Sequence, residues 1–251
     1  MKTRFRILEI IALTILLMQG LTIRTTYSQE VNNKEYLLET VWGGTTRTNK
    51  YNPDNYSPGC HSTALSQILY YHRLQPKGEK EYTTIKGHEI KENYSDHTFN
   101  WDLFVNIINE NTLEEFVDEV ALYKYYVATV VEKNFGNGSY QKTFHKSQIK
   151  KHFDCKVRER FGYKTFLLSR RKVRNIIVKE INKKRPVYFH YTDFDGGGHS
   201  VVIDGYKQKD DNLWVHTNFG WGGKKNDWYI YEKDCFLKET KLELIITIKP
   251  I

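Results

Sequence analysis

The chain reads Ser57-Pro58-Gly59-Cys60-His61-Ser62-Thr63-Ala64-Leu65-Ser66-Gln67 at the point where a loop region changes into a helical pattern. Upstream, residues 42–59 are rich in glycine, proline and asparagine, which excludes a long regular element. Downstream, apolar residues recur at helical spacing until Gln75-Pro76 interrupts the pattern. This stretch therefore predicts a helix that carries Cys60 at or near its N-terminus.

A cysteine at a helix N-terminus is suited to nucleophilic catalysis. The thiolate is the attacking species, and a free cysteine with a pKa of about 8.5 is mostly protonated at neutral pH. The partial positive charge and the free N–H groups of the first helical turn stabilise the anion. The alternative is that Cys60 is a small buried apolar residue, which is common for a lone cysteine.

Beyond this segment, helical patterns come before strand patterns. Apolar residues at helical spacing predict two more helices, at residues 111–131 and 171–182. Short runs rich in Val, Ile, Tyr and Trp predict strands at residues 186–191, 199–206, 212–218 and 227–231. The predicted class is α+β, with an antiparallel sheet after the helices, and residues 30–251 are predicted to form one domain because no linker follows residue 40.

Two segments of the C-terminal half supply partners for a catalytic thiol. Gly196-Gly197-Gly198-His199 precedes an apolar strand, so the histidine is expected at the edge of the sheet, where it can serve as a general base. Asn218 precedes a turn with Phe219 and Trp221, and its amide oxygen could hold the second ring nitrogen of that histidine. The other interpretations are a histidine that only caps a loop and a hairpin with core aromatics.

Four segments resemble, in the same order, the streptopain family of cysteine peptidases. They are residues 57–67, 99–102, 197–206 and 218–223. The resemblance implies a papain-like fold, with a helical half and a sheet half around a cleft, and it implies that Cys60 and His199 form the catalytic pair.

The same resemblance implies further roles around this pair. Asn218 would orient His199, and Phe219 would occupy the place of an aromatic residue, usually tryptophan, that covers the pair. Trp221 and Gly198 are the expected supporting residues.

One feature of the family pattern is absent. The family typically places a glutamine two residues after a tryptophan upstream of the nucleophile, whereas Gly43 and Gly44 follow Trp42 here. That glutamine helps to hold the oxyanion, and loss of one such donor costs about a hundredfold to a thousandfold in rate. The backbone N–H of Cys60 and the side chain of Asn49 are the expected substitutes.

The first residues predict export. Three basic residues, Lys2, Arg4 and Arg6, precede an apolar run whose uninterrupted core is shorter than the roughly 20 residues that a bilayer requires. Residues 1–29 are therefore predicted to be a secretory signal, and the protein is expected to be secreted, periplasmic or at the cell surface, with membrane contact only during export. A retained amphipathic anchor is the alternative.

Few residues separate this signal from the segment that resembles the family, so no long inhibitory pro-segment is expected. A separate inhibitor or pro-segment protein is then a candidate partner.

Charge and composition argue against nucleic acid as a partner. Removal of residues 1–29, with four basic residues and one acidic residue, lowers the net charge from +8 to +5. Basic clusters at residues 170–174 and 183–185 come with no nucleic-acid-binding signature, so solvated helix faces explain most of these charges.

The three cysteines, Cys60, Cys155 and Cys235, are an odd number. In an oxidising compartment at least one thiol then stays unpaired or bridges to another chain, and the sequence leaves open whether Cys155 and Cys235 pair.

These observations predict an exported cysteine endopeptidase that acts on protein or peptide substrates and requires no metal and no cofactor. His199 would accept the Cys60 proton, the thiolate would attack the carbonyl, and water would release the acyl-enzyme. Two alternatives remain: a papain-like module that binds a peptide or partner with little turnover, and an amidase that acts on cell-wall amides.

Overall fold

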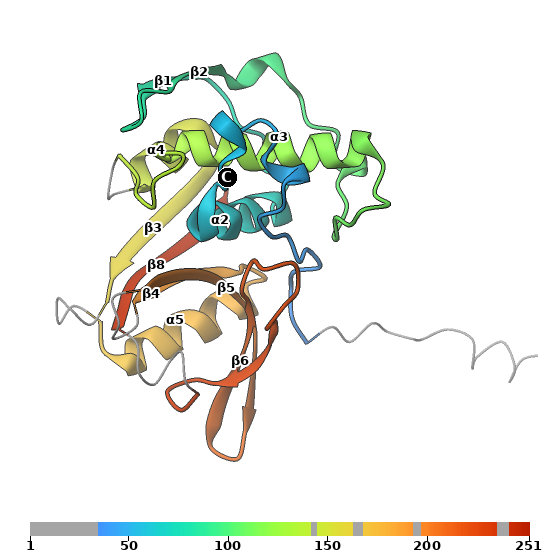
Figure 1. The fold of residues 1–251 in the computed structure, drawn as a ribbon. Coiled ribbons are helices and arrows are strands. Elements are labelled where there is room, and N and C mark those ends of the chain that lie inside the picture. The colour runs from blue at the N-terminus through green and yellow to red at the C-terminus, as the bar shows by residue number, and fades with distance from the viewer. Residues whose placement is uncertain (1–34, 142–144, 163–167, 193–196, 235–240) are drawn as a thin grey trace, which may run out of the picture. The chain divides into compact units, whose positions relative to one another are not determined.

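A computed structural model describes residues 35–141, 145–162, 168–192, 197–234 and 241–251 (Figure 1). The predicted signal sequence at residues 1–29 and Cys235 lie outside the described residues, so neither the signal nor a Cys155–Cys235 disulfide is tested. No described helix has both the length and the apolar character needed to cross a bilayer.

Most of the described helices come first along the chain, and five strands follow the last helix. The α-helices are α2 (Gly59–Tyr71), α3 (Glu114–Val130), α4 (Lys146–His152) and α5 (Arg170–Asn182). Short 3-10 helices are η1 (Arg47–Asn49), η2 (Pro53–Asn55), η3 (Tyr94–Asp96) and η4 (Trp101–Leu103). The strands are β1 (Glu79–Thr83), β2 (Glu89–Asn93), β3 (Cys155–Phe161), β4 (Val187–Thr192), β5 (Gly198–Lys209), β6 (Asn212–Asn218), β7 (Asp227–Ile230) and β8 (Lys241–Pro250).

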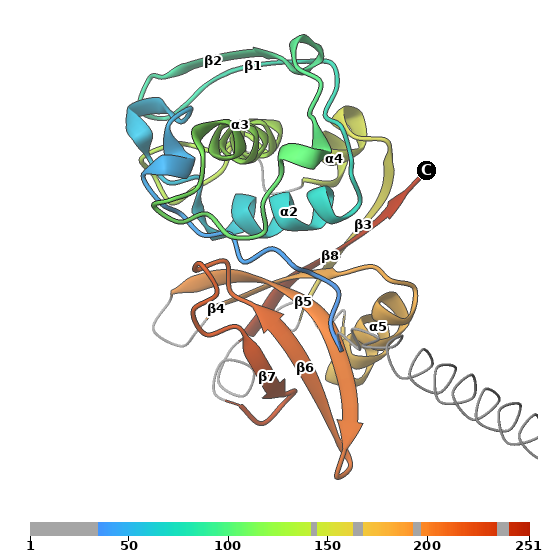
Figure 2. The same cartoon turned by 90° about the vertical axis from the view of Figure 1, so that its right-hand side faces the viewer.

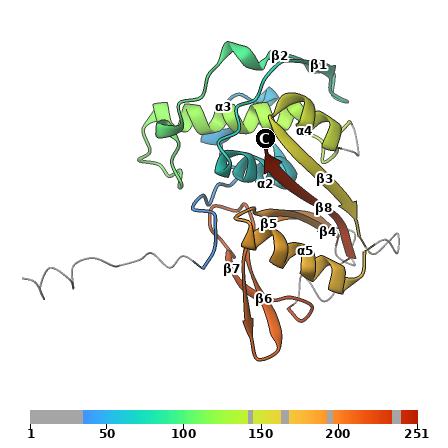
Figure 3. The same cartoon turned by 180° about the vertical axis from the view of Figure 1, so that it is seen from behind.

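Six of the strands form one antiparallel sheet in the order β3-β8-β4-β5-β6-β7, and β1 and β2 form a separate hairpin. In Figure 2, α2 and α3 lie on one side of the sheet and α5 lies on the other. Figure 3 shows α5 from behind, along β4 and β5. Helices therefore lie on both faces of the sheet, over β4 and β5.

Alternation of side chains along the strands supplies a core on each face. Tyr188 of β4 packs into the cluster with α2 and α3, while its neighbours Val187 and Phe189 pack into the cluster with α5. In β8, Ile246 belongs to the first cluster and Ile245 to the second. Successive side chains of a strand point to opposite faces of the sheet. A strand that is buried on both faces therefore needs apolar residues at odd and at even positions.

Helix α2 begins where the sequence predicts and ends earlier. Gly59 has a φ of +80°, a left-handed conformation that lets the chain turn into the helix directly after Pro58. At the other end Arg73 adopts a φ of +51°, and its N–H and that of Leu74 bond back to the carbonyls of residues 70 and 69. This Schellman-type ending stops the helix before the predicted Gln75-Pro76 boundary.

The α+β class is confirmed, and the predicted helices and strands match α3, α5, β4, β5, β6 and β7 within a few residues. β1, β2, α4, β3 and β8 were not predicted. β3 is the clearest case, because Cys155 and Val157 alternate with Lys156 and Arg158, a short period-2 pattern of a half-buried strand that the prediction overlooked.

Candidate active site

Cys60 lies in the first turn of α2 and lines a cavity of about 680 Å³. The helical half contributes Cys60 and the segment after α3, with Lys133 and Tyr140, to its wall. The sheet contributes Tyr188 of β4 and Ser200 of β5. The volume is in the range of ordinary ligand sites, and the cavity lies between helical and sheet elements, as a papain-like cleft requires.

His199 of β5 forms a hydrogen bond with the Cys60 thiol. Burial raises the pKa of Cys60, but the hydrogen bond and charge of His199, together with hydrogen bonds from Ser200, outweigh burial and lower the pKa from its ordinary value of 9.0 to about 7. Roughly half of the thiol is therefore ionised at neutral pH. The two residues that the sequence predicted as a pair, far apart in the chain, are brought together here.

The second ring nitrogen of His199 is held by the backbone. Its Nε2 lies 2.9 Å from the carbonyl oxygen of Phe219. A carbonyl can only accept a hydrogen bond, so Nε2 must carry the proton, and Nδ1 is left as the basic nitrogen of the neutral ring. The imidazole is thus set in the tautomer that a general base requires.

Asn218 does not bond directly to His199, and this part of the sequence prediction is corrected. Its side chain is 2% exposed and donates to the carbonyl of Thr40 at 2.7 Å. Its Oδ1 accepts the backbone N–H of Gly220 at 3.0 Å. That N–H belongs to the same peptide group as the Phe219 carbonyl, so Asn218 holds the acceptor of His199 rather than His199 itself.

Two aromatic rings cover His199. Trp221 is nearer, with ring centroids 4.4 Å apart, and it is 41% exposed. Phe219 stacks at 5.9 Å and is 4% exposed. The shielding position nearer to the histidine and to solvent thus belongs to Trp221, while Phe219 packs inside the core cluster next to α5.

The loop before α2 packs against this aromatic turn. A Cβ atom at Gly43 would lie only 2.7 Å from the backbone nitrogen of Gly222, so glycine is required at position 43. The buried Lys124 donates to the carbonyl of Gly43 at 2.7 Å and holds the loop from the other side. A Cβ atom at Gly44 would approach the hydroxyl of Ser57 at 3.0 Å, so that position also has little room.

Of the predicted oxyanion donors, the structure gives no support to Asn49. The residue ends η1, is 7% exposed and lies outside the cavity that Cys60 lines. Its Oδ1 has no hydrogen-bond partner among the described residues, and no described hydrogen bond joins it to Cys60. The backbone N–H of Cys60, in a first helical turn with no intrahelical acceptor, stays the predicted donor. Gly198, a predicted supporting residue, lines the cavity against His190.

A buried hydrogen-bond network beside the thiol was not predicted from the sequence. The Ser200 hydroxyl, which also bonds to Cys60, lies 2.8 Å from the Tyr188 hydroxyl and 2.9 Å from Nδ1 of His190. Tyr188 bonds in turn to Nδ1 of His61, whose Nε2 lies 3.0 Å from Nδ1 of His145. Strict alternation would place Ser200 on the face opposite His199, so no sequence signal pointed to it.

Ser200→Ala should raise the pKa of Cys60, because the thiolate loses a hydroxyl donor. We expect an increase of up to about one unit, smaller than the change on loss of His199. The pH dependence of the rate of alkylation by iodoacetamide measures it. Ser66→Ala is the matched control, since that buried hydroxyl bonds, among the described residues, only to the Ser62 carbonyl. Ser200→Thr keeps the hydroxyl and should restore the profile, and an unchanged pKa in Ser200→Ala would contradict the assignment.

The model of the Peptidase C10 family matches residues 38–229. The thiol protease/hemagglutinin PrtT of Porphyromonas gingivalis is 28% identical over 176 residues, which are 67% of this chain and 20% of that protein. Streptopain of Streptococcus pyogenes is 27% identical over 188 residues, which are 68% of this chain and 44% of that protein.

Solved structures agree on the fold. The active wild-type interpain A cysteine protease of Prevotella intermedia superposes with a TM-score of 0.71 at 20% identity, over 84% of this chain and 92% of that chain. A fragment of prointerpain A from the same organism gives a TM-score of 0.70 at 20% identity, over 86% and 71% of the two chains. The papain-like architecture is therefore confirmed, while this chain spans less than half the length of the curated relatives it matches.

Proposed function

This chain belongs to the peptidase C10 family, and from that premise we propose that it is a cysteine endopeptidase with Cys60 as nucleophile and His199 as general base. The observation that carries the proposal is the hydrogen bond between Cys60, on the wall of a cavity, and His199, with the pKa of the thiol lowered to about 7. A thiol of ordinary pKa in a closed core would not support it.

The proposed reaction follows from the geometry of the pair. Nδ1 of His199 takes the thiol proton, and the thiolate attacks the carbonyl carbon of a peptide bond held in the cavity. The Cys60 backbone N–H, at the positive end of α2, donates to the developing oxyanion. His199 then gives its proton to the leaving amine and activates the water that hydrolyses the acyl-enzyme.

Asn218 is proposed as a positioning residue that acts through the Phe219–Gly220 peptide group. Asn218→Ala should lower kcat about tenfold to a hundredfold with little change in KM, because the acceptor of His199 is no longer fixed. The same variant should raise the pKa of Cys60 in the alkylation profile, a result that a role in packing alone would not produce.

The matched control for Asn218 is Gln67→Ala. It removes the hydrogen bonds between Gln67 and Asn218 but leaves the one from Gly220 to Asn218. If Asn218→Ala and Gln67→Ala lost activity equally and the pKa of Cys60 did not change in either variant, Asn218 would have a structural role only.

Export is also proposed, on the basic and apolar sequence of residues 1–29. The mature protein would then act outside the cytoplasm on protein or peptide substrates. Expression of the full chain with its own N-terminus, followed by N-terminal sequencing of the protein in the medium or periplasm, tests this. Release of a chain that begins near residue 29 is expected, and an intact N-terminus retained in the cell contradicts export.

The activity is tested by combining a substrate assay with labelling. Purified protein should hydrolyse casein. An epoxysuccinyl peptide inhibitor should add the mass of one inhibitor molecule at Cys60, and the fraction of protein labelled should equal the fraction of activity lost. Peptidoglycan is assayed in parallel. Tight peptide binding without turnover would favour the binding module, and release of cell-wall fragments without casein hydrolysis would favour the amidase.

A further inference from the structure

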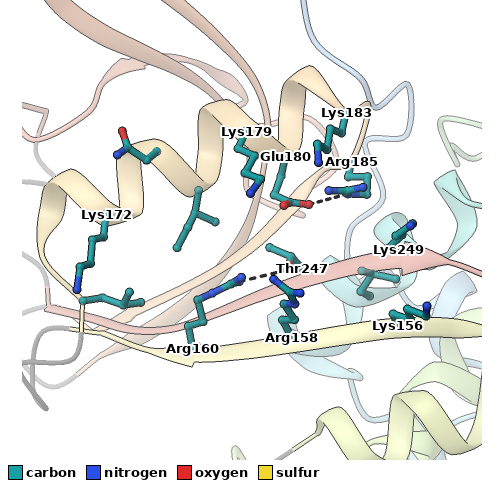
Figure 4. Close-up of a pocket in the computed structure, with 14 residues that line it drawn as sticks. Lys156, Arg158, Arg160, Lys172, Lys179, Glu180, Lys183, Arg185, Thr247 and Lys249 are labelled. Atoms are coloured by element: carbon teal, nitrogen blue, oxygen red, sulfur yellow. Dashed lines mark hydrogen bonds and ion pairs between the residues drawn. The ribbon is translucent and has the colours of Figure 1, made fainter.

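A second cavity lies on the α5 side of the sheet, and it shares no lining residue with the Cys60 cavity. It encloses about 670 Å³ between α5 and the strands β3 and β8. Figure 4 shows basic side chains that project into it from the helix on one side and from the strands on the other. We call it the basic groove.

The cations of the basic groove stand in two rows. Lys172, Lys179 and Lys183 follow one face of α5 and the residue after it, at separations of seven and four residues, over about 16 Å. Lys156, Arg158 and Arg160 follow alternate positions of β3, over about 13 Å. Two rows of this length, facing each other, form a channel of positive charge rather than a single point site.

The described residues neutralise little of the charge of these rows. Glu180 is the one acidic residue among the described residues that line the groove; it attracts Arg160 electrostatically, and its Oε2 accepts from Nε of Arg185 at 2.6 Å. In the part of the chain that the structure describes, no carboxylate forms an ion pair with any of the six cations of the two rows. Arg160 bonds to the hydroxyl of Thr247 at 3.3 Å, a neutral partner.

Like charges are also placed at positions where they repel. Lys156 of β3 is paired directly opposite Lys249 of β8, and both line the groove. Like charges at opposed positions of neighbouring strands destabilise a sheet. Lys179 and Lys183 repeat this arrangement on the helix side, four residues apart. Repulsion at two places around one cavity is relieved when an anion occupies it.

From these observations we propose that the basic groove binds a linear polyanion, a chain of sulfate or phosphate groups without aromatic bases. Two opposed rows of cations match an extended chain with repeated charges, since each anionic group meets a cation on either wall. Among the described residues, the lining contains no Phe, Tyr, Trp or His. Single-stranded nucleic acids are held largely by bases stacked on aromatic side chains, and the described lining offers no such ring.

Binding is measured by titration calorimetry with a size-defined heparin oligosaccharide and with inorganic polyphosphate of equal charge. The affinity of the wild-type protein should fall steeply with NaCl, because binding releases counterions. Binding of the heparin chain alone identifies sulfate as the ligand group, and binding of polyphosphate identifies phosphate. Failure of both to bind at low salt would overturn the proposal.

The test variant is Lys156→Glu combined with Lys179→Glu. Each new carboxylate stands next to a remaining cation, opposite Lys249 and four residues before Lys183, so the folded state gains two favourable pairs. Affinity for the polyanion should nevertheless drop at least about tenfold, with a shallower salt dependence. The alkylation rate of Cys60 should stay unchanged, which shows that the fold and the other cavity are intact.

The matched control reverses two exposed lysines outside the groove, Lys151→Glu with Lys209→Glu, and changes the net charge by the same amount. It should bind as the wild type does. Equal weakening in both double variants would mean attraction by net charge alone and would overturn the site. A further ligand is oligothymidylate of equal charge. If it bound as tightly as heparin or polyphosphate, the groove would not select polyanions without bases, and that part of the proposal would be overturned.

Discussion

Cys60→Ala should abolish peptide hydrolysis, with a fall in kcat/KM of at least about 10⁴-fold, because no other described group can form the acyl-enzyme. The thiol lies on the cavity wall and has a pKa of about 7, so it supplies the thiolate at neutral pH. Steady-state hydrolysis of casein or a fluorogenic peptide measures the loss. Intact mass after treatment with the epoxysuccinyl inhibitor should show no adduct.

The matched control for this variant is Cys155→Ala. Cys155 is 1% exposed, and burial raises the pKa of its thiol to about 11, so it stays protonated and inert. Cys155→Ala should keep hydrolysis and still take up one inhibitor equivalent. Full proteolysis by Cys60→Ala, or an adduct that disappears only in Cys155→Ala, would disprove the nucleophile.

His199→Ala should be nearly as damaging, through the ionisation of the thiol. His199 lowers the pKa of Cys60 against the opposing effect of burial, so its removal should let that pKa rise to about the ordinary value of 9.0, since burial and the remaining hydrogen bonds from Ser200 act in opposite directions. A thiolate exists above its pKa. The ionised fraction at pH 7 therefore falls from about one half to about one hundredth or less, and alkylation by iodoacetamide should slow about fiftyfold.

The pH dependence of alkylation and of hydrolysis separates two roles of His199, which are to lower the pKa of the thiol and to donate a proton to the leaving amine. At about pH 10 the thiolate of His199→Ala forms without help, so alkylation should recover toward the wild-type rate. Hydrolysis should not recover, because the leaving amine still lacks a proton donor. His88→Ala, which removes a histidine that no described contact links to Cys60, is the control. Recovery of hydrolysis together with alkylation would mean that His199 only adjusts the thiol pKa.

The polyanion proposal is independent of both experiments. If Cys60→Ala retained activity, the peptidase mechanism would fail, while the two rows of cations around α5 and β3 would still predict polyanion binding. If heparin and polyphosphate failed to bind, the catalytic pair would be unaffected. A protein that carries both sites would hydrolyse peptides on one face of its sheet while held to an anionic polymer on the other.

Features that depend on neighbours in the chain were predictable. The Pro58-Gly59 turn, the first helical turn at Cys60 and the strand after His199 all follow from local propensity and spacing, and the structure has them. The end of α2 was not predicted, because the residue that terminates the helix in a left-handed conformation is Arg73, where glycine is usual. β8 was not predicted, because its apolar run shows that it is a strand only once its pairing with β3 and β4 is known.

The sequence by itself determined the class of fold, the place of Cys60 at a helix start and the place of His199 at the start of a strand, because each depends on local patterns along the chain; the strand is an interior one and not the predicted sheet edge. The tertiary structure alone decided that the carbonyl of Phe219, and not the amide of Asn218, holds His199, and that Ser200 reaches the thiol. It alone also brought α5 to β3 and made one groove of two basic segments. Contacts between elements depend on how faces pack, and spacing along the chain does not contain that information.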